Sequence, residues 1–123
     1  MIRDISEHEH AKYLMLWAGY VEINCPHVSL LFAIPNGGHR KKGEAGKMKA
    51  EGVKAGVPDY FLPVARGKYH GLFIELKTVK GKLSKPQKIW KMELEEQGFK
   101  VEVCHGWEAA AKAITNYLKT KRG

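Results

Sequence analysis

The stretch Leu72-Phe-Ile-Glu-Leu-Lys77 has the composition of a buried β-strand, yet it carries two charges. Residues two apart on a strand share a face, so the side chains of Glu75 and Lys77 point the same way as Phe73. Burial of a charge is costly unless the charge is paired or binds a metal. A carboxylate and an ammonium in an otherwise apolar strand therefore predict a functional site on one face of a sheet.

Asp59 stands at the head of a preceding short strand, Asp59-Tyr-Phe-Leu62, which follows the turn Gly56-Val-Pro58. The intervening Arg66-Gly-Lys-Tyr-His-Gly71 predicts a hairpin connection between the two strands. A hairpin brings the start of its first strand near the end of its second, so Asp59 and Glu75 are expected to converge on one cation. In the alternative, Glu75 lies on the surface of an edge strand and Asp59 only forms a turn after proline.

Converging carboxylates of this kind bind Mg²⁺ or Mn²⁺, hard cations that keep several waters and contact substrate phosphates directly. Such an ion polarises a phosphoryl oxygen and lowers the pKa of a bound water. An ammonium beside it orients that water or stabilises the negative charge that develops at phosphorus. Asp59, Glu75 and Lys77 therefore predict metal-dependent hydrolysis of a phosphodiester.

The other segments predict an α/β fold with a central mixed sheet flanked by helices. Serines that open capping boxes start two of the helices, after Ser6 and after Ser84. In chain order we expect a helix over 7–20, a strand over 30–34, a short helix over 44–53, strands over 59–62 and 72–77, a helix ending at 97, a strand over 100–104 and a helix from 107. The first helix is apolar almost all round, so it should be largely buried and end at Gly19 or near Pro26.

The charge balance points to the partner. With 21 Lys and Arg against 13 Asp and Glu, the 123 residues carry a net charge of +8. Basic side chains concentrate over 36–56 and over 77–91, and the second segment contains no acid. This balance predicts a polyanionic partner, although a solvated basic face would need none. The length predicts one domain over 1–123.

Several features bear on the compartment. The longest apolar run, Tyr13–Tyr20, is too short to span a bilayer, and no signal peptide is visible at the amino terminus. We therefore expect a cytoplasmic protein without a membrane partner. Cys25 and Cys104 are far apart and form no CxxC pair, so both are expected to be reduced core thiols. Surface or turn positions are expected for all six histidines: His8, His10, His27, His39, His70 and His105.

The motif Gly56-Val-Pro-Asp-Tyr-Phe61, followed by Ile74-Glu-Leu-Lys77, Gly81 and Leu83-Ser84 with Gln87, resembles the VRR-NUC (virus-type replication-repair nuclease) domain of the PD-(D/E)XK nuclease superfamily. Segments 35–38 and 49–53 resemble the stand-alone phage and bacterial members. The resemblance implies a restriction-endonuclease-like αβββαβ core, which agrees with the element order above, and a single VRR-NUC domain over 1–123.

The resemblance also implies roles for individual residues. Asp59 and Glu75 match the metal-binding carboxylates, the Leu76 carbonyl matches a main-chain metal ligand, Lys77 matches the catalytic lysine, and Gln87 matches a typical glutamine. A glutamate of the first helix completes such a site, and Glu7 and Glu9 are the two candidates. Glu9 is already the capping-box partner of Ser6. Glu7 shares a helical stripe with Ala11, Leu14 and Ala18, so we favour Glu7.

Two basic groups are expected to contact DNA. One follows the active strand and comprises Lys80, Lys82, Lys85 and Lys88. The other follows the glycine turn, where His39 and Arg40 would contact phosphate and Asn36 would orient the loop, beside Lys41 and Lys42.

The combined expectation is a Mg²⁺- or Mn²⁺-dependent, structure-selective DNA endonuclease. The resemblance implies a homodimer that cuts branched DNA such as four-way (Holliday) junctions, in a phage or bacterial setting, with no nucleotide cofactor. One alternative is a non-catalytic basic DNA-binding module, for which the acids are incidental. Another is a nuclease that cuts plain duplex DNA with a partner or at a short sequence motif.

Overall fold

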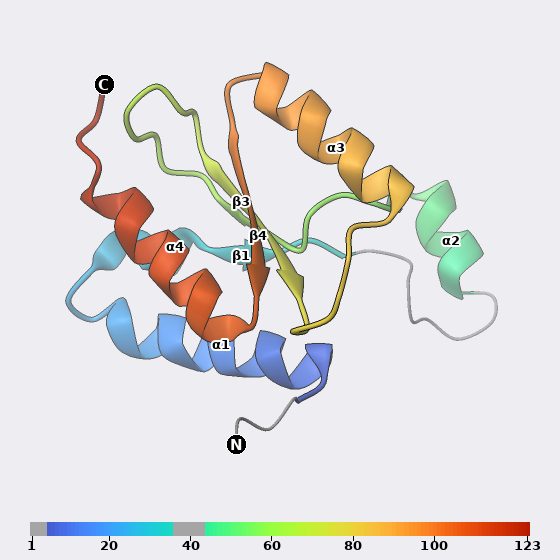
Figure 1. Ribbon diagram of the computed structural model, residues 1–123, viewed down its shortest axis with the longest axis horizontal. Helices are drawn as coiled ribbons and strands as arrows, with labels where there is room; N and C mark the ends of the chain where they lie inside the picture. Colours follow the sequence, from blue (N-terminus) through green and yellow to red (C-terminus); the bar gives the residue numbers. More distant parts are fainter. Residues whose placement is uncertain (1–4, 36–43) are drawn as a thin grey trace.

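A four-stranded mixed sheet lies at the centre of the computed structural model, which describes residues 5–35 and 44–123 (Figure 1). The strand order is β1-β2-β3-β4. The pairs β1–β2 and β2–β3 are antiparallel, and β3–β4 is parallel. The elements are α1 (Glu7–Val21), the 3-10 helix η1 (Pro26–Leu30), β1 (Phe32–Ala33), α2 (Glu44–Ala50), β2 (Tyr60–Leu62), β3 (Leu72–Lys77), α3 (Lys85–Glu96), β4 (Lys100–His105) and α4 (Trp107–Lys119). The predicted α/β class with a helix-flanked mixed sheet is confirmed.

Helices α1 and α4 lie side by side on one face of this sheet and enclose the main core (Figure 1). The buried residues of β3 on this face are Leu72, Ile74 and Leu76. They pack with Leu14 of α1 and Ile114 of α4, both fully buried. Because alternate strand residues point to opposite faces, Phe73, Glu75 and Lys77 face the other side.

Aromatic rings cover part of that second face. Phe61 and Phe73 are partners in the β2–β3 register, and their rings stack with centroids 4.3 Å apart. Phe32 and Phe99 contact Phe61 edge-on. Glu75, two residues beyond Phe73, therefore lies at the end of an aromatic row on the same face.

The first helix differs from its prediction in two ways. Gly19 lies inside α1, which ends at Val21. The expectation of a largely buried helix is wrong, since Leu16 is 62% and Tyr20 78% exposed. Only the stripe His10, Leu14 and Ala18 is buried, because the sheet and α4 contact a single side of the helix.

Smaller differences follow from local chemistry. The expected strand over 30–34 shortens to β1, because Pro26 opens η1 and the Ser29 hydroxyl closes its turn by donating to the Pro26 carbonyl at 2.6 Å. Helix α2 ends at Ala50 rather than near 53, and Gly52 adopts a φ of 101°. Both capping boxes are confirmed, as are the strand over 72–77 and the helix from Trp107. Within the described residues, no helix is long and apolar enough to cross a membrane.

Candidate metal centre

Three carboxylates from distant parts of the chain meet at the end of β3. Glu7, Asp59 and Glu75 each offer an oxygen, and these oxygens lie within 4.8 Å of one another. Tyr60 pairs with Ile74 in the antiparallel register, so Asp59, one residue earlier, comes level with Glu75. The first turn of α1 supplies Glu7. The convergence predicted for Asp59 and Glu75 is thus present, and a third acid joins them.

Main-chain and side-chain donors orient two of these acids. The Leu76 N–H donates to Asp59 Oδ2 at 2.7 Å. Gln87 Nε2, in the first turn of α3, donates to Glu75 Oε2 at 3.2 Å. Lys77 Nζ lies 3.8 Å from the same Glu75 oxygen. Gln87 also completes the capping box with Ser84, so the start of α3 is tied to the acidic cluster.

Glu75 is buried, with 2% of its surface exposed. The alternative that it lies on the surface of an edge strand is therefore wrong, because β3 is an inner strand between β2 and β4. Among the described residues, Glu75 Oε1 has no hydrogen-bond donor. A buried carboxylate oxygen without a donor is costly, and a cation would remove that cost.

The acids also perturb one another. Burial, and next the nearby charge of Asp59, raise the pKa of Glu75 to about 9. Burial raises the pKa of Asp59 as well, and the Leu76 N–H partly offsets this rise. The cluster thus disfavours two adjacent negative charges unless a cation lies between them. The set of carboxylate oxygens fits Mg²⁺ or Mn²⁺, and the Lys77 ammonium supplies only one positive charge against it.

Of the two candidate glutamates, Glu7 contributes to this cluster and Glu9 lies apart from it in the capping box. The Glu9 side chain accepts from the Ser6 N–H at 3.4 Å, and Ser6 Oγ accepts from the Glu9 N–H at 3.1 Å. The stripe argument for Glu7 agrees with this geometry, since Leu14 and Ala18 are buried in the core.

A cleft of about 1050 Å³ opens over the carboxylates. Glu7, Asp59 and Lys77 line it, together with Leu76 and Gln87. Glu75 lies beneath its floor, because its side chain is almost fully covered. The walls come from the start of α1, the end of β1, the loop before β2, the end of β3 and the start of α3.

The predicted DNA-binding residues fall into two groups. Those that follow β3 are exposed and lie beside cleft-lining Lys77, Ser84 and Gln87; they are Lys80, Lys82, Lys85 and Lys88. Those of the glycine turn lie outside the described residues; they are Asn36, His39, Arg40, Lys41 and Lys42.

The positions of two residues near the site were not predicted from the sequence. His10 is not on the surface: it is 6% exposed, and its Nδ1 accepts from the Trp107 N–H at 3.1 Å. Its position four residues before Leu14, on the buried stripe, was the signal for this. Tyr60 lines the cleft, and its hydroxyl donates to the Ala11 carbonyl at 3.5 Å. Burial raises the pKa of Tyr60.

Comparisons with known proteins agree with this geometry. The model of the VRR-NUC domain matches residues 4–108. A solved structure described as a VRR-NUC domain protein is 27% identical, with a TM-score of 0.80, over 98% of this chain and 94% of that one. No curated protein matches.

Proposed function

Because the chain belongs to the VRR-NUC nuclease family, we propose that it is a metal-dependent endonuclease that hydrolyses phosphodiester bonds in branched DNA such as four-way junctions. The observation that carries this proposal is the meeting of Glu7, Asp59 and Glu75 within 4.8 Å, at an open cleft beside exposed lysines. We also assign residues 1–123 to one domain, since Ile114 and Tyr117 of α4, beyond the matched region, pack in the same core.

The residues that would hold Mg²⁺ or Mn²⁺ are Glu7, Asp59, Glu75 and the main-chain carbonyl of Leu76. Such an ion, when bound, polarises the scissile phosphate and lowers the pKa of the attacking water. Lys77 lines the cleft with 12% of its side chain exposed, so its ammonium can donate to a phosphate oxygen or to that water. Gln87 positions Glu75 through its hydrogen bond and thereby keeps a carboxylate oxygen aimed at the cluster.

The basic flank is proposed to bind the sugar-phosphate backbone. Lys80 and Lys82 lie in the loop after β3, and Lys85 and Lys88 lie in the first turn of α3, beside the cleft. Lysine contacts to phosphate carry no sequence information, so this surface favours recognition of DNA structure over base sequence. Asn36, His39, Arg40, Lys41 and Lys42 are proposed to extend the same surface. The proposed setting is the cytoplasm of a bacterial host.

A homodimer is proposed on the basis of the exposed apolar surface at the end of α1. Leu16, Tyr20 and Ile23 are 62%, 78% and 76% exposed, and Leu16 and Tyr20, four residues apart on α1, lie on one side of the helix. Exposed apolar side chains that gather on one face favour self-association. A two-fold dimer would present two equivalent cleavage sites to two strands of a junction.

The test is incubation of the purified protein with Mg²⁺ or Mn²⁺ and end-labelled four-way junction, flap, single-stranded and linear duplex DNA. We expect metal-dependent, symmetric cuts in the junction that are absent with Lys77→Ala. Cutting of linear duplex alone would favour the alternative of a duplex nuclease.

The second candidate, a non-catalytic DNA-binding module, rests on the basic segments alone. Binding of every substrate without cutting under either metal would favour it. Asp59→Asn separates the two: it should abolish cleavage and retain DNA binding in a nuclease, and change nothing in a binding module.

A further inference from the structure

At the end of the sheet opposite the carboxylates, the loop between β2 and β3 meets the carboxyl terminus (Figure 1). The Gly67 N–H donates to the Lys121 carbonyl at 2.7 Å, and Arg66 Nε donates to the Leu118 carbonyl at 3.3 Å. These contacts bring together residues far apart in the sequence. The basic residues of these segments and of the start of β4 are named the distal basic cluster; they are Arg66, Lys68, Lys100, Lys119, Lys121 and Arg122.

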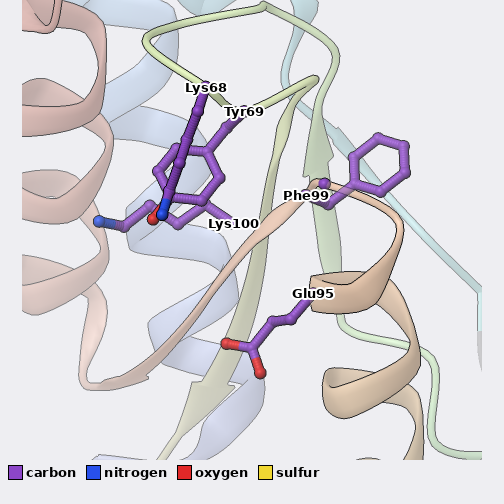
Figure 2. Close-up of a pocket in the computed structure, with 6 residues that line it drawn as sticks. Lys68, Tyr69, Glu95, Phe99 and Lys100 are labelled. Atoms are coloured by element: carbon purple, nitrogen blue, oxygen red, sulfur yellow. The ribbon is translucent and has the colours of Figure 1, made fainter.

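Two lysines of the cluster share one aromatic ring. Lys68 Nζ lies 5.5 Å and Lys100 Nζ lies 5.4 Å from the centroid of Tyr69 (Figure 2). The three residues line a pocket of about 320 Å³. Phe99 also lines this pocket, and its side chain points away from the Tyr69 ring (Figure 2). Attraction to the ring holds each ammonium beside Tyr69. An anion in the pocket would accept hydrogen bonds from these ammoniums.

Acidic residues do little to neutralise the cluster. In the described part of the chain, Lys68 forms no ion pair. Lys100 lies 4.0 Å from Glu102, and both side chains are about 40% exposed, which makes a weak pair. Glu95 lines the pocket but pairs with Lys91 at 2.9 Å. Segments 65–71 and 117–123 contain no Asp or Glu.

We propose that the distal basic cluster is a second phosphate-binding surface, in which Lys68 and Lys100, held on Tyr69, contact the DNA backbone away from the cleavage site. The inference rests on the proposed nuclease function, because DNA in the cleft supplies the phosphates. Strand β3 has six residues, about 20 Å at 3.3 Å per residue, and separates the two surfaces. One DNA segment or a second arm of a branched DNA spans that length.

The surface chemistry favours DNA over a lipid membrane. Basic surfaces that insert into a membrane combine their charges with exposed apolar side chains that enter the bilayer. No large apolar side chain is exposed in segments 65–71 or 117–123, all of which the structure describes. The cluster offers charge and hydrogen-bond donors, which is what a sugar-phosphate backbone requires.

The test compares Lys68→Gln/Lys100→Gln with Lys12→Gln/Lys112→Gln, which removes the same charge from exposed positions of α1 and α4. Binding to labelled four-way junction and duplex DNA is measured in EDTA over a range of salt concentrations. We expect the cluster variant to bind about tenfold more weakly and to lower the slope of log Kd against log salt by about two. The control should stay close to the wild type. Lys68→Arg/Lys100→Arg should restore binding, which excludes a folding defect.

Equal binding by the cluster variant and its control would overturn the inference. So would intact DNA binding with a loss of binding to vesicles of phosphatidylcholine and phosphatidylglycerol, which would identify a membrane surface. Cleavage at saturating protein reports on the proposed function separately, since neither lysine touches the carboxylates. If wild-type protein binds DNA through the cluster but never cuts, the proposed function fails, while the cluster remains a DNA-binding surface.

Discussion

The Leu76 N–H donates to the carboxylate of Asp59 at 2.7 Å, so the main chain next to Glu75 orients the neighbouring acid. Two carboxylates on adjacent antiparallel strands are thereby held together, although burial raises the pKa of both and the charge of Asp59 raises that of Glu75 further. Such electrostatic strain between two carboxylates is typical of functional sites, where a bound ligand relieves it.

Replacement of Asp59 tests the metal centre. The amide oxygen of Asp59→Asn still accepts from Leu76, so the fold should persist, but a negatively charged ligand is lost. We expect cleavage to fall by at least about 100-fold. DNA binding in EDTA should be retained or tighter, because a negative charge leaves the cleft. Cleavage by this variant at the wild-type rate would contradict a metal role for Asp59.

The pKa of Glu75 predicts how stability depends on pH. Its folded value of about 9 exceeds the usual 4.5, so between these values the folded protein holds a proton that the unfolded chain has released. The contribution of Glu75 to stability is therefore full below about pH 4.5 and is lost progressively as pH rises towards 9.

Thermal unfolding in EDTA from pH 5 to 9, compared between the wild type and Glu75→Gln, measures this effect. As pH rises, the unfolding free energy of the wild type should fall steadily relative to that of the variant. Excess Mg²⁺ should reduce that change in the wild type, since the ion replaces the proton. Parallel curves for the two proteins at every pH would show that Glu75 is ionised throughout.

Gln87 has two roles that a matched pair of variants separates. Ser84→Ala removes the helix cap alone and should lower stability by about 1 kcal/mol with little change in cleavage. Gln87→Ala also removes the bond to Glu75, so cleavage or metal affinity should fall by about 10- to 100-fold. Unfolding curves and Mg²⁺ titrations of cleavage distinguish them. The same loss of cleavage in both variants would leave Gln87 with a capping role only.

The exposed face of α1 predicts self-association. Leu16→Glu/Tyr20→Glu should give a monomer by light scattering and keep the melting temperature of the isolated fold, because both side chains are mostly exposed. Lys12→Glu, on the same helix, serves as the charge control. A monomeric wild type, or a dimer that survives the double substitution, would rule out this surface as the dimer interface.

Local features of the fold followed from residues close together in the chain. Capping boxes involve residues three apart, and the amphipathic stripe of α4 repeats every three or four, so both were predictable. The bounds of the short strand β1 were harder to predict, because the residues just before it, Pro26–Leu30, form a 3-10 helix.

By itself, the sequence determined the charged strand 72–77, the hairpin that brings Asp59 to it, and the family, because each depends on a short run of residues. Tertiary structure alone decided that Glu75 is buried, since burial depends on the strands that flank β3. It also decided that α1 leaves Leu16 exposed, and it brought Glu7, which the helical stripe already favoured over Glu9, to the other acids. The distal basic cluster also depends on tertiary structure, because its residues come from three separate segments that only the folded chain brings together.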